Sequence, residues 1–114
     1  MPHFIIDCSE NILNLKPAEE IIREVHDTAD ATGLFAKGDI KVRINPFNLF
    51  TVGNSKDDFI HIIAHIMGGR SSTQKKNLST QIIKKLKTFF PDVPIISMDV
   101  RDIDKTTYSN RKMV

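Results

Sequence analysis

The chain has 114 residues, of which 40% are hydrophobic and 26% are charged, and its formal net charge is +2. This size fits one domain with one core, residues 1–114, and the charge balance excludes intrinsic disorder and a broad nucleic-acid-binding surface. We expect a cytoplasmic protein without membrane contact, because neither a run of about 18 apolar residues nor a signal-peptide pattern is present.

The chain opens with Met1 and Pro2, directly before an apolar segment. Removal of Met1 leaves Pro2 with a free secondary amine, and an unperturbed α-amino group has a pKa of roughly 7.7–8.0. Burial in an apolar pocket lined by cations lowers such a pKa, so that the neutral amine can take a proton from a carbon next to a carbonyl. The alternative is that Pro2 is only the first residue of a strand, where a proline need not donate to the ladder.

Residues 2–8 predict a buried strand, which the polar residues 9–11 end. The strand contains Cys8, the only cysteine, which we expect to lie in the core, with a reactive thiol as the alternative. A helix follows, with Pro17 in its first turn and Gly33 after its end. Its apolar stripe consists of Ile21, Ile22, Val25 and Ala29.

Residues 39–44 alternate with the period of a second strand. One face carries Ile40, Val42 and Ile44, and the other carries Lys41 and Arg43. The two cations either face solvent or reach an anionic group. Turn-forming residues then mark the connection to the next element: Pro46, Gly53 and Asn54.

Residues 58–67 predict a third strand with two apolar faces. One face carries Ile60, Ile62, Ala64 and Ile66, and the other carries Phe59, His61, Ile63, His65 and Met67. A small monomer usually exposes the second face of its sheet to water, so this pattern suggests that another subunit covers it. A buried helix is the alternative for so short a run.

The last third of the chain predicts a helix, a strand and a tail. Ser71 and Gln74 form a capping-box signature, and Pro91 ends the helix. The apolar stripe of this helix consists of Leu78, Ile82, Leu86 and Phe89 or Phe90. The strand runs from Pro94 to about Asp102, with Ile96, Met98 and Val100 on one face, and residues 104–114 form a tail or a partner-contacting extension. The order strand, helix, strand, strand, helix, strand predicts an α+β fold with a four-stranded sheet and both helices on one face.

A histidine pair and a group of lysines raise the possibilities of metal binding and nucleic-acid binding, and we expect neither. His61 and His65 would share a metal on a helix, but a strand separates them by about 13 Å and no HExxH glutamate is present. We therefore do not expect these two histidines to form a metal site. The lysines at positions 75, 76, 84, 85 and 87 are typical of a solvated helix face, and no pattern of exposed aromatics supports nucleic-acid binding.

Arg70 follows two glycines at a strand end and precedes a helix N-terminus. Flexible backbone, a fork of donors and free amides together favour binding of a carboxylate. An arginine that pairs with a surface carboxylate is the structural alternative.

Three segments resemble a known family: residues 1–12, residues 31–35 (Ala-Thr-Gly-Leu-Phe) and residues 68–71 (Gly-Gly-Arg-Ser). They are similar to the 5-carboxymethyl-2-hydroxymuconate isomerases of the tautomerase superfamily. The resemblance covers about residues 1–103. It implies a βαββαβ subunit in a homotrimer with active sites near the subunit boundaries.

The resemblance also implies roles for individual residues. Pro2 is the general base, Arg70 binds a substrate carboxylate, and no metal or cofactor takes part. The family usually has an arginine where this chain has Lys41, which supplies charge but no bidentate fork, so that Arg43 is a candidate to take over the role. The departure puts the substrate in question more than the reaction type.

The sequence thus predicts an isomerase of aromatic catabolism that moves a proton in an unsaturated 2-hydroxy or 2-oxo dicarboxylate, such as 5-carboxymethyl-2-hydroxymuconate. The first alternative is a tautomerase of a different enol, similar to phenylpyruvate. The second is a non-catalytic trimeric binding or signalling protein, which retention of Met1 would favour.

Overall fold

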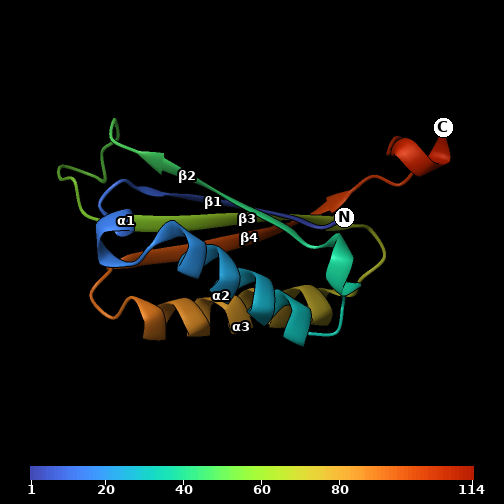
Figure 1. Cartoon of the computed structure of the whole chain (residues 1–114), viewed down its shortest axis with the longest axis horizontal. Helices are drawn as coiled ribbons and strands as arrows, with labels where there is room; N and C mark the ends of the chain where they lie inside the picture. Colours follow the sequence, from blue (N-terminus) through green and yellow to red (C-terminus); the bar gives the residue numbers. More distant parts are fainter.

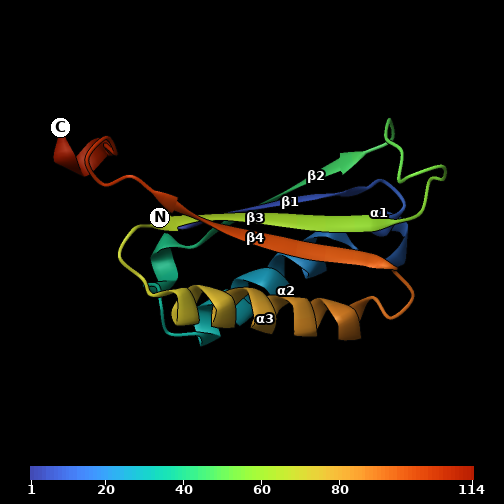
Figure 2. The ribbon, with the colours of Figure 1, turned by 180° about the vertical axis from the view of Figure 1, so that it is seen from behind.

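The computed structural model describes residues 1–114, and its four strands form one sheet in the order β2-β1-β3-β4. The elements are β1 (His3–Ser9), α1 (Ile12–Leu15), α2 (Ala18–Ala31), β2 (Lys41–Phe47), β3 (Phe59–Met67), α3 (Ser72–Phe89) and β4 (Ile95–Ile103), with short 3-10 helices at Lys37–Asp39 and Arg111–Met113. β1 is parallel to β2 and antiparallel to β3, and β3 is parallel to β4. Helices α2 and α3 lie side by side on one face of the sheet (Figures 1 and 2), which confirms the predicted α+β fold.

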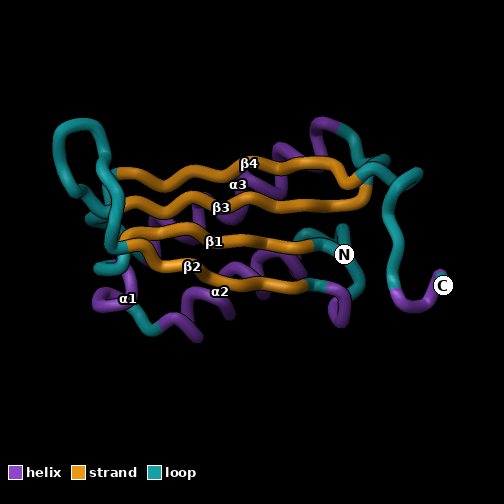
Figure 3. The backbone as a smooth tube through the Cα atoms, turned by 90° about the horizontal axis from the view of Figure 1, so that it is seen from above, coloured by secondary structure: helices purple, strands orange, loops and turns teal.

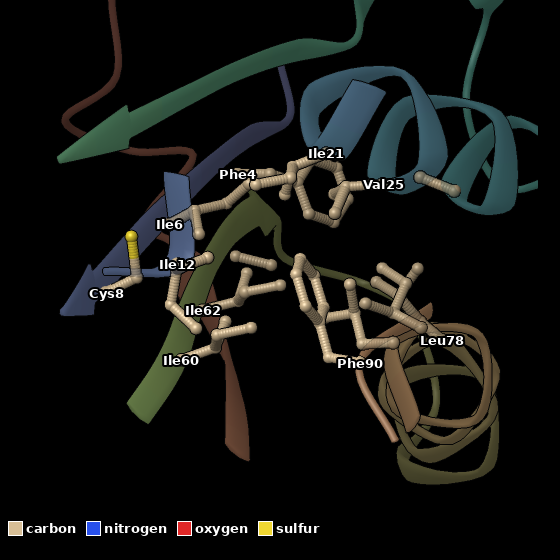
Figure 4. Close-up of a cluster of buried hydrophobic side chains, with 14 of the residues drawn as sticks. Phe4, Ile6, Cys8, Ile12, Ile21, Val25, Ile60, Ile62, Leu78 and Phe90 are labelled. Carbon is tan, nitrogen blue, oxygen red and sulfur yellow. The ribbon is translucent and has the colours of Figure 1, made fainter. Parts of the chain in front are cut away.

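The core fills the space between the sheet and these two helices (Figure 4). Alternation along β3 buries every second side chain on the helix-covered face, beginning with Ile60. The predicted helix stripes meet this face with Ile21, Val25 and Ala29 from α2 and Leu78, Ile82 and Leu86 from α3, all buried. The strand interpretation of residues 58–67 is therefore correct, and the helix alternative is wrong.

Local sequence signals set the ends of both long helices. In α3 the Ser71 side chain accepts from the amide of Gln74, and the Gln74 side chain accepts from the amide of Ser71, which confirms the capping box. Gly33 follows α2 with φ of +74°, a conformation that favours glycine and ends the helix. Pro17 is the N-cap of α2 and so lies one residue before its first turn.

Three features of the fold differ from the sequence prediction. The short helix α1 was not expected, and β2 begins at Lys41 because the preceding Lys37–Asp39 forms a 3-10 turn. Pro46, expected in the connection, lies inside β2 opposite Cys8. This position suits proline because β2 is an edge strand, where one side of the backbone needs no hydrogen-bond partner.

Cys8 is fully buried in the core cluster, and burial raises the pKa of its thiol to about 11. The core interpretation of this residue is therefore correct, because such a thiol is protonated and inert near neutral pH. None of the helices combines the length and apolar character that a membrane crossing requires.

The second face of the sheet is left open by the helices (Figure 3). We call it the open face. It carries half-buried apolar side chains, Ile5 and Ile63 at its centre, together with the three histidines His3, His61 and His65. His61 lies 2.6 Å from the Ser97 hydroxyl, so it has a partner on β4.

Candidate active site

Pro2 directly precedes β1 at one end of the sheet and is fully buried. Its carbonyl accepts a hydrogen bond of 3.1 Å from the Lys41 amide, which extends the β1–β2 ladder by one bond. Side chains alternate along β1, so Pro2 shares the helix-covered face with Phe4, whereas His3 points to the open face. Met1 precedes Pro2 in this structure, and the Pro2 nitrogen is therefore an amide rather than a base.

Lys41 places a cation beside the N-terminus. Its Nζ donates to the Asp39 carbonyl at 2.6 Å, which holds the side chain near the sheet end. The pKa of the Met1 ammonium is lowered, first by partial burial and then by a hydrogen bond with Lys41 and the charge of Lys41, against an opposing effect of Asp39. The start of β1 is thus an environment that favours a neutral amine.

Arg43 lies two residues further along β2, on the open face. Its Nη1 is 3.0 Å from His3 Nδ1 on the neighbouring strand. Lys41 and Arg43 are both exposed, so both cations are accessible from the same side of the sheet. The structure therefore places these two predicted site residues on one face of β2, with the Lys41 backbone bonded to Pro2 and the Arg43 side chain beside His3.

Arg70 lies on the other side of the sheet end, against the loop after α2. Its Nη2 donates to the Leu34 carbonyl at 2.6 Å, its Nη1 to the Met67 carbonyl at 3.3 Å, and its guanidinium lies 5.2 Å from the Phe35 ring centre. Phe35 in turn packs edge-to-face on Phe4, with ring centres 6.0 Å apart. Arg70 is thus linked to the Pro2 side of β1 through two aromatic rings.

These contacts limit which N–H groups near Arg70 can bind a carboxylate. Arg70 donates one hydrogen bond to each of two carbonyls, and its other N–H groups make no hydrogen bond within the subunit. The capping box occupies the amides of Ser71 and Gln74 at the start of α3, so they are not free to bind an anion. The surface-carboxylate alternative for Arg70 is also absent, because its partners are backbone carbonyls.

The main cavities of the single chain lie away from these residues. Its largest cavity lies between α2 and α3 and is lined by mostly polar side chains, among them Asp27 and Lys84. Pro2, Lys41, Arg43 and Arg70 line none of the main cavities. No group of three or more His, Cys, Asp or Glu side chains is placed to hold a metal ion.

Comparison with known proteins decides the family. Residues 2–113 match the family model described as 5-carboxymethyl-2-hydroxymuconate isomerase. The chain belongs to this family. The resemblance found in its three sequence segments is therefore confirmed, and the chain is an isomerase of the tautomerase superfamily.

Among its relatives is the 5-carboxymethyl-2-hydroxymuconate Delta-isomerase of Escherichia coli, 28% identical over 92 residues, which are 79% of this chain and 73% of that protein. A family structure from Deinococcus radiodurans R1 superposes with a TM-score of 0.85 at 18% identity, covering 96% of this chain and 88% of the other. A fused 4-OT symmetric trimer gives 0.80 at 14% identity, covering 98% and 95%. At these identities the two structures show the fold alone.

Two further residues contact the predicted site residues. His3 bonds to Arg43, and Phe35 supports Arg70, yet neither was assigned a role before the structure. A parallel pairing of residues 3–9 with residues 41–47 would have placed His3 beside Lys41 and Arg43. Phe35 lies in the segment 31–35 that carries the family resemblance, but its contact with Arg70 depends on tertiary packing.

Proposed function

We propose that the chain, after loss of Met1, isomerises an unsaturated 2-hydroxy or 2-oxo dicarboxylate related to 5-carboxymethyl-2-hydroxymuconate, with Pro2 as general base. One observation carries the proposal: the buried Pro2 lies at the sheet end directly beside Lys41. The lowered pKa of the amine one residue earlier supports it, because a free Pro2 amine is exposed to the same burial and the same cation.

The proposed reaction moves one proton. The neutral Pro2 amine takes a proton from a carbon next to the substrate carbonyl, and the electron pair of the broken C–H bond delocalises into a dienolate. Lys41 stabilises the developing oxyanion. The protonated Pro2 then returns the proton to the far carbon, so that substrate and product are isomers and Pro2 is again neutral.

The two carboxylates of the substrate need separate cations. We assign one to Arg70, whose remaining N–H groups extend from the Phe35 side of the sheet end. The other is assigned to Arg43, which lies exposed on the open face. In this assignment Pro2 acts on a carbon between the two carboxylates of the substrate.

We further propose a homotrimer whose open faces meet. The open face exposes apolar surface on both central strands, and the site residues of one chain line no main cavity. Residues 104–114, which we call the C-terminal arm, extend past the sheet on its open side (Figures 1 and 2). A neighbouring subunit would cover the face and complete the walls of the site. The fused 4-OT protein with the same fold is a symmetric trimer.

Mass spectrometry of the intact protein combined with kinetics tests the proposal. We expect a mass lacking one methionine and isomerisation of 5-carboxymethyl-2-hydroxymuconate. Pro2→Ala leaves a primary amine and should keep part of the activity, whereas a blocked or extended N-terminus should lose nearly all of it. Equal rates for extended and processed protein would contradict the role of Pro2.

Lys41 favours one second candidate, a tautomerase of a monocarboxylate enol related to phenylpyruvate. A lysine lacks the bidentate fork that suits a carboxylate, so the open-face subsite could prefer a carbonyl oxygen instead. A substrate panel separates the two: a higher kcat/KM for the phenylpyruvate enol than for the muconate would favour the second candidate. Retention of Met1 with no activity on either would favour a binding or signalling protein.

A further inference from the structure

The N-terminal end of the open face carries a row of basic side chains across all four strands. In register, His3 on β1 lies opposite Lys41 on β2 and His65 on β3, and His65 lies opposite Arg101 on β4. Arg43 reaches into this row from the next position of β2. The row contains no carboxylate, and the nearby Asp99 is bound to Arg101 at 2.7 Å.

The contact between His3 and Arg43 has a defined polarity. A guanidinium carries only donors, so the 3.0 Å contact from Arg43 Nη1 requires a lone pair on His3 Nδ1. His3 is therefore neutral in this contact, with its proton on Nε2. Protonation of Nδ1 replaces the hydrogen bond by repulsion between two cations.

We propose that neutral His3 is a positioning residue that holds Arg43 for a substrate carboxylate, and that protonation of His3 releases Arg43 and weakens substrate binding. The inference rests on the proposed function, in which Arg43 is a substrate-binding cation. His3 acts through Arg43, which its ring contacts, and not on the reacting carbon. The effect therefore falls on KM rather than on kcat.

The surroundings of His3 favour the neutral form. Partial burial lowers its pKa most, followed by the charges of Arg43 and Lys41, the N-terminus and His65. The hydrogen bond between His3 and Arg43 thus persists at neutral pH. It is lost only in acid, below the ordinary histidine pKa of about 6.5.

Two substitutions of His3 distinguish the effect of its hydrogen bond to Arg43 from the effect of its protonation. The Oδ1 atom of an asparagine lies close to the position of histidine Nδ1, so His3→Asn keeps an acceptor for Arg43 that cannot be protonated. His3→Leu keeps the bulk and removes the acceptor. His61→Asn is the matched control, because His61 lies on the same face but contacts Ser97.

The readout is KM and kcat for the muconate substrate between pH 7.5 and pH 5.5. We expect the KM of the unaltered protein and of His61→Asn to rise about threefold on acidification, as the loss of an exposed charged contact predicts. His3→Asn should keep the low KM at both values, and His3→Leu should show the raised KM at both. An identical pH dependence of KM in His3→Asn and the unaltered protein, or an unchanged KM in His3→Leu, would overturn the inference.

An NMR titration of the His3 ring tests the interaction with Arg43 without depending on enzymatic activity. Arg43→Gln removes the neighbouring cation, so we expect the pKa of His3 to rise in that variant. An unchanged pKa would show that the two residues do not interact and would refute the inference even in an active enzyme. If the protein does not isomerise the muconate, the proposed function fails, and the dissociation constant of glutarate measured by calorimetry in the same variants replaces KM.

Discussion

Pro2 and Lys41 are joined by a hydrogen bond of 3.1 Å between the Pro2 carbonyl and the Lys41 amide, at the point where β1 and β2 begin side by side. This bond holds the backbone of Pro2, the proposed base, against the backbone of Lys41. It also keeps the Lys41 side chain, anchored on the Asp39 carbonyl, close to the N-terminus. The distance between base and cation is therefore set by the sheet itself.

Lys41→Ala should lower kcat/KM by about tenfold to a hundredfold, because it removes a cation from the developing oxyanion. It should also move the acid limb of the kcat/KM profile to higher pH. The sign follows from the charge: Lys41 disfavours the protonated amine and lowers its pKa, so its removal raises that pKa, and the base is protonated at higher pH. Steady-state kinetics from pH 5 to pH 9 measure both effects.

Lys84→Ala on the solvated face of α3 serves as the control for the loss of a positive charge. Lys41→Arg should restore much of the rate, because it keeps the charge and matches the residue usual in the family. An acid limb that does not move in Lys41→Ala would show that Lys41 does not act on the base.

The stability of the protein should decrease in mild acid through His3. Its pKa in the folded state is lowered, mainly by burial and by Arg43, so the unfolded chain takes up a proton first as the pH falls. This contribution to stability is complete above the unfolded pKa of about 6.5, declines below it and is fully lost once the pH has fallen through the lower folded value. Urea unfolding at pH 7.5 and pH 5.5, at one fixed protein concentration, measures the difference.

His3→Asn should unfold with a smaller difference between these two pH values, because asparagine does not titrate. His61→Asn, on the same face, isolates the effect of changing a histidine there. The same loss of stability on acidification in His3→Asn and the unaltered protein would assign the effect to other groups.

The sequence predicted most of the fold because its signals are local and periodic. The alternation from Ile60 to Ile66 and the stripe from Leu78 to Leu86 each identify a buried face without any knowledge of the partner. The position of Pro46 was wrong for the converse reason. Proline usually ends a strand, and only the sheet order reveals that β2 is an edge that accepts it.

The candidate site was less predictable, because its contacts join distant residues. The resemblance singled out Arg70, but not that Leu34 and Met67 occupy two of its donors. The bond between His3 and Arg43 depends on the parallel pairing of β1 with β2, which no single segment encodes. Local patterns therefore identified the charged groups, and the tertiary structure determined which of them are held and which remain free.

Cys8 should not react with Ellman's reagent in the folded protein at pH 8. The thiolate is the reactive form, and burial raises the pKa of this thiol to about 11, so few molecules carry it and the reagent cannot reach it. We expect one thiol per chain to react in 6 M guanidinium chloride and almost none without it. Rapid labelling of the native protein would show that the β1 strand opens readily at this end.

Removal of the C-terminal arm should dissociate the proposed trimer with little effect on the subunit fold. The hydrogen bonds of residues 106–114 are all made within the arm, and Met113 and Val114 are exposed to 63% and 98%. A segment that makes no hydrogen bond to the rest of its subunit contributes little to that subunit's core, and its exposed apolar end is free to bind a neighbouring one. Sedimentation equilibrium of a chain ending at Ile103 should show a lower mass at micromolar concentration, with an unchanged far-ultraviolet circular dichroism spectrum.

Met113→Ser combined with Val114→Ser is the milder version of the same test, because it keeps the length of the arm and removes only its apolar end. We expect weaker association than in the full chain, with a dissociation constant between those of the full and shortened proteins. If the shortened chain remains a trimer, the open face alone holds the assembly together and the arm has no part in it. If the shortened chain unfolds instead, the arm stabilises its own subunit, contrary to the contacts seen here.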